Sequence, residues 1–270
     1  MNIIKEHSDQ FKKIGGALLI GTGIYLVYRY AFKSGDSNGS KKPLKIVFTK
    51  DDKYKESIKG LSLKIEPELM AHSLSKSSMN LIKKVAIGLI QDEYPKRVVN
   101  HRKERRKYLK KQITYLEVSV SHMNDLEWLY ENACSEVVKD LNIDPAFFES
   151  EMKRHLNLDP SLESVSYFIL ESLKIKLVNK SKNIDKQQFI DYIKYQIDNY
   201  GKEPFPNTLK LDQETFYVIK QTYYQDLAAE KTGIEEEEFM ARPDLLLDPL
   251  LKDLSDMLSK RHIDDQTREE

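Results

Sequence analysis

Cysteine is almost absent from this 270-residue chain, and its scarcity excludes two common ways of stabilising a fold. The single cysteine, Cys134, can form neither a disulfide within the chain nor a zinc site built on several thiolates. This usage is typical of a protein in a reducing compartment. Because Ala133 and Val137 flank it on a predicted helix, we interpret Cys134 as a half-buried structural thiol and not as a nucleophile.

An excess of either charge is also lacking. The chain has 43 acidic and 43 basic residues, so it carries no overall field that would attract a polyanion. A dedicated nucleic-acid binder normally shows a strong basic excess, and nucleic acid is therefore not expected as a partner. Any electrostatic partner must be met by a local cluster of charge.

The sequence signatures of the common enzyme classes are missing as well. It has no Gly-rich phosphate loop, no G-x-S-x-G elbow and no H-E-x-x-H motif. Glu151 and His155 have the one-turn helical spacing that can chelate a metal, but no second histidine-containing pair accompanies them. We interpret them as an ordinary surface pair, and we expect no enzymatic activity, no cofactor, no metal site and no small-molecule substrate.

What the chain does contain is one apolar run near its N-terminus, residues 14–28, between Lys12–Lys13 and Arg29. As a helix this run is about 22 Å long, and extension through residue 32 brings it to about 28 Å, just enough for a hydrocarbon core of ~30 Å. No small-residue cleavage site follows it, which disfavours a removable leader. We therefore predict a single transmembrane helix, with a buried core helix as the alternative. Its membrane-anchoring residues are Ile14, Leu18, Leu19, Ile20, Ile24, Leu26, Val27 and Tyr28.

The composition after this run predicts the order of the segments. Residues 1–33 form a tail and the anchor, and the small polar residues of 34–43 form a flexible linker closed by Pro43. Residues 44–270 form a helical domain, and the glycine and two prolines of 201–207 mark a candidate internal boundary. A short span with basic flanks is typical of single-pass organelle proteins, and we prefer the mitochondrial membrane over the endoplasmic reticulum.

Helix signals dominate the sequence from about Pro67 onward. Asp144, Asp185 and Asp212 have the character of N-caps, and each lies next to an apolar pair that can form a hydrophobic staple. Asn124 shows the same pattern, with Met123 and Trp128 as the staple. Helices are predicted near 97–117, 124–141, 145–157, 160–178, 186–200, 213–231 and 249–261.

One more helix is predicted to begin near Ser78, where an apolar stripe repeats with helical spacing. The stripe consists of Leu81, Ile82, Val85, Ala86, Leu89 and Ile90. Alternating residues at 44–48 and 61–65 suggest two short strands. The predicted fold class is therefore all-α: an irregular multi-helix domain of packed helical hairpins behind an N-terminal transmembrane helix, with those two short strands as its non-helical elements.

The segment from Ile184 to Phe189 resembles the second half of an EF-hand calcium loop. Carried over, the twelve-residue loop begins at Leu177, has Lys182 at its turn and ends at Gln188. A calcium loop requires Asp at the first position, Gly at the turn and a bidentate Glu at the end. The resemblance therefore implies a degenerate EF-hand scaffold and no calcium site.

Two oppositely charged clusters stand out. In the basic stretch 96–111 the single acidic residue is Glu104, and the charged residues are otherwise lysines and arginines. Residues 100–107 are expected to be a solvated stretch of helix. We interpret the basic stretch as a docking face for anionic lipid headgroups or an acidic protein partner, ahead of a nucleic-acid backbone, with a plain exposed helix face as the alternative. The acidic run 235–238 is expected to cap a helix, and it can also pair with the basic helix. The basic docking face consists of Lys96, Arg97, Arg102, Lys103, Arg105, Arg106, Lys107, Lys110 and Lys111.

Together these features favour a non-enzymatic, membrane-anchored structural or accessory subunit, or a tether, at an organelle membrane. Its expected partners are the lipid bilayer, the other proteins of a membrane complex and anionic headgroups. The alternative is a peripheral adaptor or sensor with degenerate EF-hand-like helical pairs.

Overall fold

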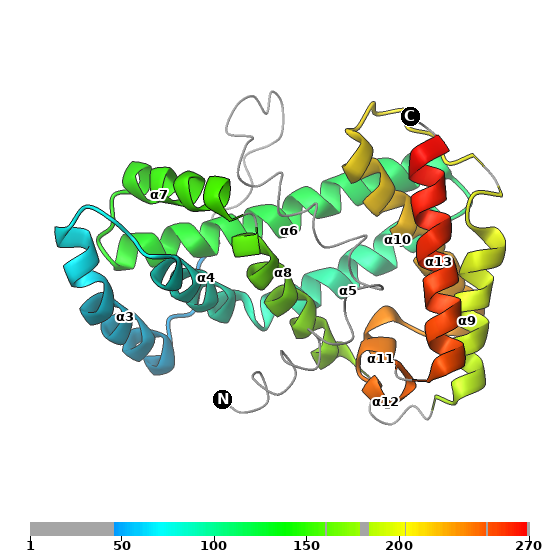
Figure 1. Ribbon diagram of the computed structural model, residues 1–270, viewed down its shortest axis with the longest axis horizontal. Helices are drawn as coiled ribbons and strands as arrows, with labels where there is room; N and C mark the ends of the chain where they lie inside the picture. The colour runs from blue at the N-terminus through cyan, green and yellow to red at the C-terminus, as the bar shows by residue number, and fades with distance from the viewer. Residues whose placement is uncertain (1–45, 160, 179–183, 203, 247, 269–270) are drawn as a thin grey trace. The chain divides into compact units, whose positions relative to one another are not determined.

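A computed structural model describes residues 46–268 of the chain, except 160, 179–183, 203 and 247 (Figure 1). The secondary structure of these residues is helical and contains no β-strand, so the predicted all-α class is confirmed. The helices are α3 (Asp52–Met70), α4 (Lys76–Ile90), α5 (Glu93–Arg106), α6 (Gln112–Asp140), α7 (Pro145–Leu158), α8 (Ser161–Lys174), the 3₁₀ turn η1 (Ile175–Leu177), α9 (Lys186–Asn199), α10 (Gln213–Thr232), α11 (Glu236–Met240), α12 (Pro243–Leu246) and α13 (Pro249–Arg268).

The described chain divides into two compact units. The N-terminal unit comprises the described residues of 46–100 and 121–173, and the C-terminal unit those of 101–120 and 174–268. The division falls inside α5 and inside α6, so each of these helices contributes residues to both units. The segment 201–207, expected to be an internal boundary, lies inside the C-terminal unit.

In the N-terminal unit α3 packs on α4. Half of the predicted stripe of α4 is confirmed, since Ile82, Ala86 and Ile90 are fully buried, whereas Leu81, Val85 and Leu89 are half-buried. The strand expected at 61–65 is wrong, because these residues lie in α3 with Leu61 and Ile65 buried one helical turn apart. A repeat at i and i+4 fits a helix as well as alternation fits a strand. Residues 46–50, which include most of the other expected strand, have no regular secondary structure.

Lys50 fastens this first extended segment to the C-terminal end of α6. Its Nζ donates to Glu136 Oε1 at 2.6 Å and to Asp140 Oδ1 at 2.9 Å. The hydroxyl of Tyr54 donates to Asp140 Oδ2 at 2.7 Å, so the first turn of α3 is held at the same place. The tie explains why the chain enters α3 where it does.

The predicted boundaries around residue 110 need correction. The helix expected at 97–117 is interrupted at residues 107–111, and α6 runs without a break through Asn124, where a helix was expected to begin. Asn124 therefore does not begin a helix, and the carboxylate of the neighbouring Asp125 accepts a hydrogen bond of 2.7 Å from Arg97 Nη1. A cap signal has no effect when the preceding residues are already helical, because the N–H groups it would satisfy bond to carbonyls one turn earlier.

The helix starts predicted at 145, 186, 213 and 249 are confirmed, whereas residue 160, where another was expected, lies outside the described residues. The side chains of Asp144, Asp185 and Asp212 each accept a hydrogen bond from the backbone N–H three residues later, at 2.8–2.9 Å. Asp185 and Gln188 also complete a reciprocal capping box. Asp248 accepts from the backbone N–H of Leu250 at the start of α13. These side chains satisfy N–H groups that have no partner within their helices.

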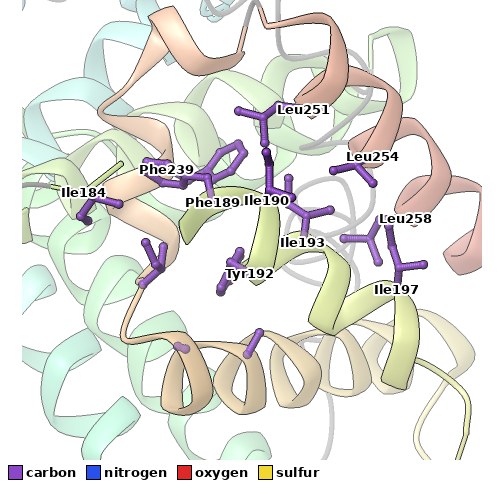
Figure 2. Packing of buried hydrophobic residues seen from close by; sticks show 13 residues of the cluster. Ile184, Phe189, Ile190, Tyr192, Ile193, Ile197, Phe239, Leu251, Leu254 and Leu258 are labelled. Atoms are coloured by element: carbon purple, nitrogen blue, oxygen red, sulfur yellow. The ribbon is translucent and has the colours of Figure 1, made fainter. Parts of the chain in front are cut away.

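The core of the C-terminal unit lies where α9 packs on α10 and α13. Figure 2 shows Ile193 and Ile197 of α9 beside Leu254 and Leu258 of α13. The ring of Phe189 meets that of Phe239 edge to face, with centroids 4.9 Å apart. This contact holds α11 against the start of α9 and so positions the acidic residues described next.

Candidate functional site

Three arginines at the end of α5 point into the C-terminal unit. The side chains of Arg102, Arg105 and Arg106 are only 11%, 15% and 21% exposed. The expectation that residues 100–107 form a solvated stretch is therefore wrong for these three positions. The cause is a set of carboxylates from α10 and the start of α11, more than a hundred residues later in the chain.

Asp226 of α10 is the centre of this arrangement and is 2% exposed. Its carboxylate accepts from Arg105 Nε at 2.5 Å, from Arg106 Nε at 2.9 Å and from the hydroxyl of Tyr115 at 2.7 Å. Arg105 adds a second bond from Nη2 at 3.2 Å. A buried carboxylate is tolerated when all its acceptor sites are used in this way.

The electrostatic balance at Asp226 favours the charged form. Burial raises the pKa of its carboxyl, but the guanidiniums of Arg105 and Arg106 and the Tyr115 hydroxyl outweigh burial, so the pKa lies below its ordinary value. Burial and the negative charge of Asp226 raise the pKa of Tyr115 well above its ordinary range. Tyr115 is therefore a neutral donor at physiological pH.

The acidic run that follows α10 supplies the other carboxylates. Glu235 accepts a bidentate pair from Arg106 Nη1 and Nη2, both at 2.7 Å. Glu237 accepts another from Arg102 Nη1 and Nη2, both at 2.8 Å. The two roles expected for this run are both present, because Glu235 is also the N-cap of α11 in a capping box with Glu238.

Gly233 makes this placement possible. It ends α10 with φ of +72°, and its N–H donates to Ala229 O at 2.7 Å. A left-handed C-cap of this kind favours glycine, since any other residue is strained there. The turn sends the chain directly into Ile234, which is fully buried, and then into Glu235. We call Arg102, Arg105, Arg106, Tyr115, Asp226, Glu235 and Glu237 the Asp226 network.

The lysines of the same stretch have the opposite orientation. Lys103, Lys107, Lys110 and Lys111 are exposed and make no ion pair with any residue of the described chain. In the N-terminal unit Lys96 is also exposed, whereas Arg97 bonds to Glu93 and Asp125. The structure thus divides the predicted basic face into arginines engaged within the chain and lysines open to solvent.

Glu151 and His155 of α7 are not the surface pair that was expected, because Glu151 is buried and both side chains contact the backbone of Leu74. Glu151 Oε2 accepts from Leu74 N at 2.7 Å, and His155 Nε2 lies 2.5 Å from Leu74 O. Arg154 Nη2 lies 3.0 Å from the same ring nitrogen and also donates to Leu74 O at 3.3 Å. Both polar groups of Leu74 are thereby satisfied, and the loop between α3 and α4 is clamped to α7.

Three further expectations concern Cys134, the EF-hand-like segment and the anchor. The expected half-burial of Cys134 is confirmed. The segment resembling an EF-hand loop connects η1 to α9, but residues 179–183 at its centre lie outside the described residues. The expected anchor at 14–28, from Ile14 to Tyr28, lies outside them as well. Within the part of the chain that was described, no helix combines the length and apolarity needed to cross a bilayer.

A second surface feature, on α3, was not predicted. Leu63, Pro67 and Met70 are exposed at positions i, i+4 and i+7, and the side chains of Leu63 and Met70 are 66% and 74% exposed. Residues with this spacing lie along one side of a helix. We call these three residues the α3 stripe. It lies apart from Leu61 and Ile65, the positions that α3 buries.

Sequence reasoning also missed Asp226 and Tyr115. The available signal was an acid, Asp226, three residues from Tyr223 and from Ala229 on a helix that mixes aromatic, small and polar residues. An acid on a buried helix face requires a cationic partner.

Within the described residues, no three His, Cys, Asp or Glu side chains come together as a metal site. Comparison with protein-family models, with curated proteins and with solved structures found no match.

Proposed function

We propose that this protein is a non-enzymatic, membrane-anchored accessory subunit or tether that acts through protein contacts at an organelle membrane, with the mitochondrial membrane preferred. In this proposal residues 14–28 hold the chain in the bilayer, and residues 34–43 link the anchor to the helical units. Support for the anchor comes from the length of the apolar run and its basic flanks. Support for the protein contacts comes from α3.

The α3 stripe is the observation that carries the proposal. A helix that buries one side and exposes three apolar residues at i, i+4 and i+7 on another is suited to lie in an apolar groove of a partner. Single exposed apolar residues are common, but residues aligned along one helix face expose a continuous apolar surface to water. Covering that surface with a partner is favourable by about 25 cal/mol per Å² of apolar area removed from water.

The test is co-purification of the full-length protein from its native membrane in mild detergent. We expect a stoichiometric partner that is lost from a Leu63→Glu/Met70→Glu double variant, because two carboxylates would be desolvated in the contact. A matched control, Ser57→Glu/Ser62→Glu, places the same charge on other exposed positions of α3 and should retain the partner.

Both variants should keep the wild-type helical circular dichroism and melting temperature, since all four positions are exposed. A monodisperse wild-type monomer without an associated protein would contradict the accessory role. A partner retained equally by both double variants would show that the contact is made elsewhere than on the α3 stripe.

A further inference from the structure

Four exposed lysines follow one another at the end of α5 and in the turn after it. Lys103 and Lys107 are four residues apart, one helical turn. Residues 107–111 then continue as a tighter turn, with Tyr108 N, Leu109 N and Lys111 N donating to carbonyls three residues earlier. In such a turn positions i and i+3 lie on the same side, so Lys110 follows Lys107. We call Lys103, Lys107, Lys110 and Lys111 the lysine row.

The opposite side of this segment is fixed to the C-terminal unit. Arg105 and Arg106 bind Asp226 and Glu235, and Leu109 is buried. The carbonyl oxygen of Leu109 accepts from the hydroxyl of Tyr223 at 2.9 Å. The backbone that carries the lysine row is therefore held on its inner side, while the four ammonium groups remain in water.

The separation of the two cation types indicates the kind of partner. Arginine is enriched and lysine depleted in protein interfaces, because the planar guanidinium makes fixed bidentate contacts. Here Arg102, Arg105 and Arg106 bind carboxylates within the unit. The cations that remain exposed on this segment are the ammonium groups of the lysine row, which are strongly hydrated and lie on flexible side chains. These suit a fluid layer of anionic headgroups, in which charges can rearrange around each ammonium. Ile113, 50% exposed two residues after Lys111, adds an apolar side chain that can enter the interface.

We propose that the lysine row docks on the anionic headgroups of the membrane in which the protein is anchored. This inference rests on the proposed function, since an anchor at residues 14–28 would keep the whole chain, and the row with it, at high effective concentration near the bilayer. Glu104 is the acidic residue among the exposed charges from 103 to 111, so the local charge remains strongly positive. An acidic protein surface is the competing occupant, and the experiment separates the two.

The experiment reconstitutes the full-length protein into phosphatidylcholine vesicles with and without phosphatidylserine. Every lysine is then acetylated with a water-soluble reagent and quantified by mass spectrometry at low and high salt. On serine-containing vesicles at low salt, we expect acetylation of the lysine row to fall by about fivefold or more, and to recover at high salt. Four exposed lysines of the same unit, Lys194, Lys231, Lys252 and Lys260, are internal controls and should not change.

A matched pair of variants provides the second measurement. When both kinds of vesicle are offered during reconstitution, replacing the four lysines of the row with glutamine should lower the share of protein that enters the serine-containing vesicles, by up to about fivefold per lysine. Replacing the four control lysines with glutamine removes the same charge and should leave the preference unchanged. Both variants should unfold at the wild-type temperature, because all eight side chains are exposed.

Each alternative outcome is decisive. Equal acetylation of the row on neutral and anionic vesicles would overturn the docking, as would an equal fall at the control lysines. Protection that appears only when proteins of the native membrane are added would assign the row to an acidic protein partner. Retention of the protein in neutral vesicles after alkaline extraction tests the anchor separately. If the protein is extracted but the lysine row is still protected from acetylation on serine-containing vesicles, the proposed function is refuted and the docking is not.

Discussion

The two units of this protein fasten their helices with ion pairs in different settings. In the C-terminal unit Asp226 is almost completely buried and binds Arg105, Arg106 and Tyr115 at once. In the N-terminal unit Lys50 binds Glu136 and Asp140, and the side chains of Lys50 and Glu136 are each 30% exposed. Water screens the second arrangement and hardly reaches the first.

The difference teaches that the strength of such a contact depends on what remains after one partner is removed. A buried network missing one member leaves an uncompensated charge in a medium that solvates it poorly. A half-exposed pair missing one member leaves a charge that water can solvate. Mutations should therefore have unequal effects in the two units, even though the ion-pair distances are similar.

The largest expected effect is that of Asp226→Asn in the C-terminal unit. The change keeps the side-chain volume but leaves Arg105 and part of Arg106 without a counter-charge, which should lower the free energy of unfolding by about 3–5 kcal/mol. Urea denaturation of the full chain measures it. Asp253→Asn, at an exposed position of α13, is the matched control. A loss no larger than that of the control would show that the network is not essential for stability.

The second-largest effect is expected from acid, which should lower the contribution of the Asp226 network to the free energy of unfolding. Burial raises the pKa of Glu235 as it does that of Asp226, but the arginines outweigh it, so both carboxyls titrate below their ordinary values in the folded state. Near pH ~4 the folded state then binds fewer protons than the unfolded state. The contribution of the two carboxylates to the free energy of unfolding is therefore complete above that pH, and it is lost as the pH falls toward their lowered pKa values.

Urea midpoints measured over this acid range test the effect. The wild-type curve should fall more steeply with decreasing pH than that of Asp226→Asn, in which one of the two titrating groups is gone. The ordering would be reversed if burial alone governed Asp226, because a raised pKa makes acid stabilising. Parallel curves would also contradict the pKa shift assigned to this residue.

A smaller loss is expected from Glu151→Ala in the N-terminal unit. The change leaves the Leu74 N–H without its acceptor, a penalty of about 1–3 kcal/mol for a buried donor. Amide hydrogen exchange should locate the effect, with faster exchange at Leu74 and the first turn of α4. Glu149→Ala, which removes an exposed carboxylate from the same helix, should change neither quantity appreciably.

The smallest effect should come from Lys50→Met. The half-exposed pairs with Glu136 and Asp140 are expected to contribute about 0–1 kcal/mol, and methionine retains the apolar stem. Thermal unfolding at low and high salt tests this, since added salt should bring wild type and variant together. A loss as large as that of Asp226→Asn would remove the distinction between the two units.

The parts of the fold that were predicted depend on short stretches of sequence. The caps Asp144, Asp185 and Asp212 bond to N–H groups three residues away, so the neighbouring sequence contains the whole interaction. Asn124 shows where this reasoning fails. The residues before it already belong to α6, which begins at Gln112, and the next residue, Asp125, pairs with Arg97. A local signal cannot report what the preceding turn of helix is doing.

The candidate site was predicted only in outline, for a related reason. Opposite charge suggested that the acidic run could meet the basic helix, but Arg102 and Glu237 are separated by 135 residues. Their pairing depends on Gly233 turning the chain and on Phe239 seating α11 against Phe189. Which cations turn inward is decided by this packing, so the sequence could not separate Arg105 from Lys103.

The Lys50 tie also has a mechanical consequence. A pull on the chain ahead of Lys50 would strain its bonds to Glu136 and Asp140 before reaching the first turn of α3. Because these charges are partly hydrated, the bonds can rupture and re-form with little loss of energy. Under brief tension the ion pairs of Lys50 would then break and re-form reversibly, while the hydrogen bonds of α3 remain intact.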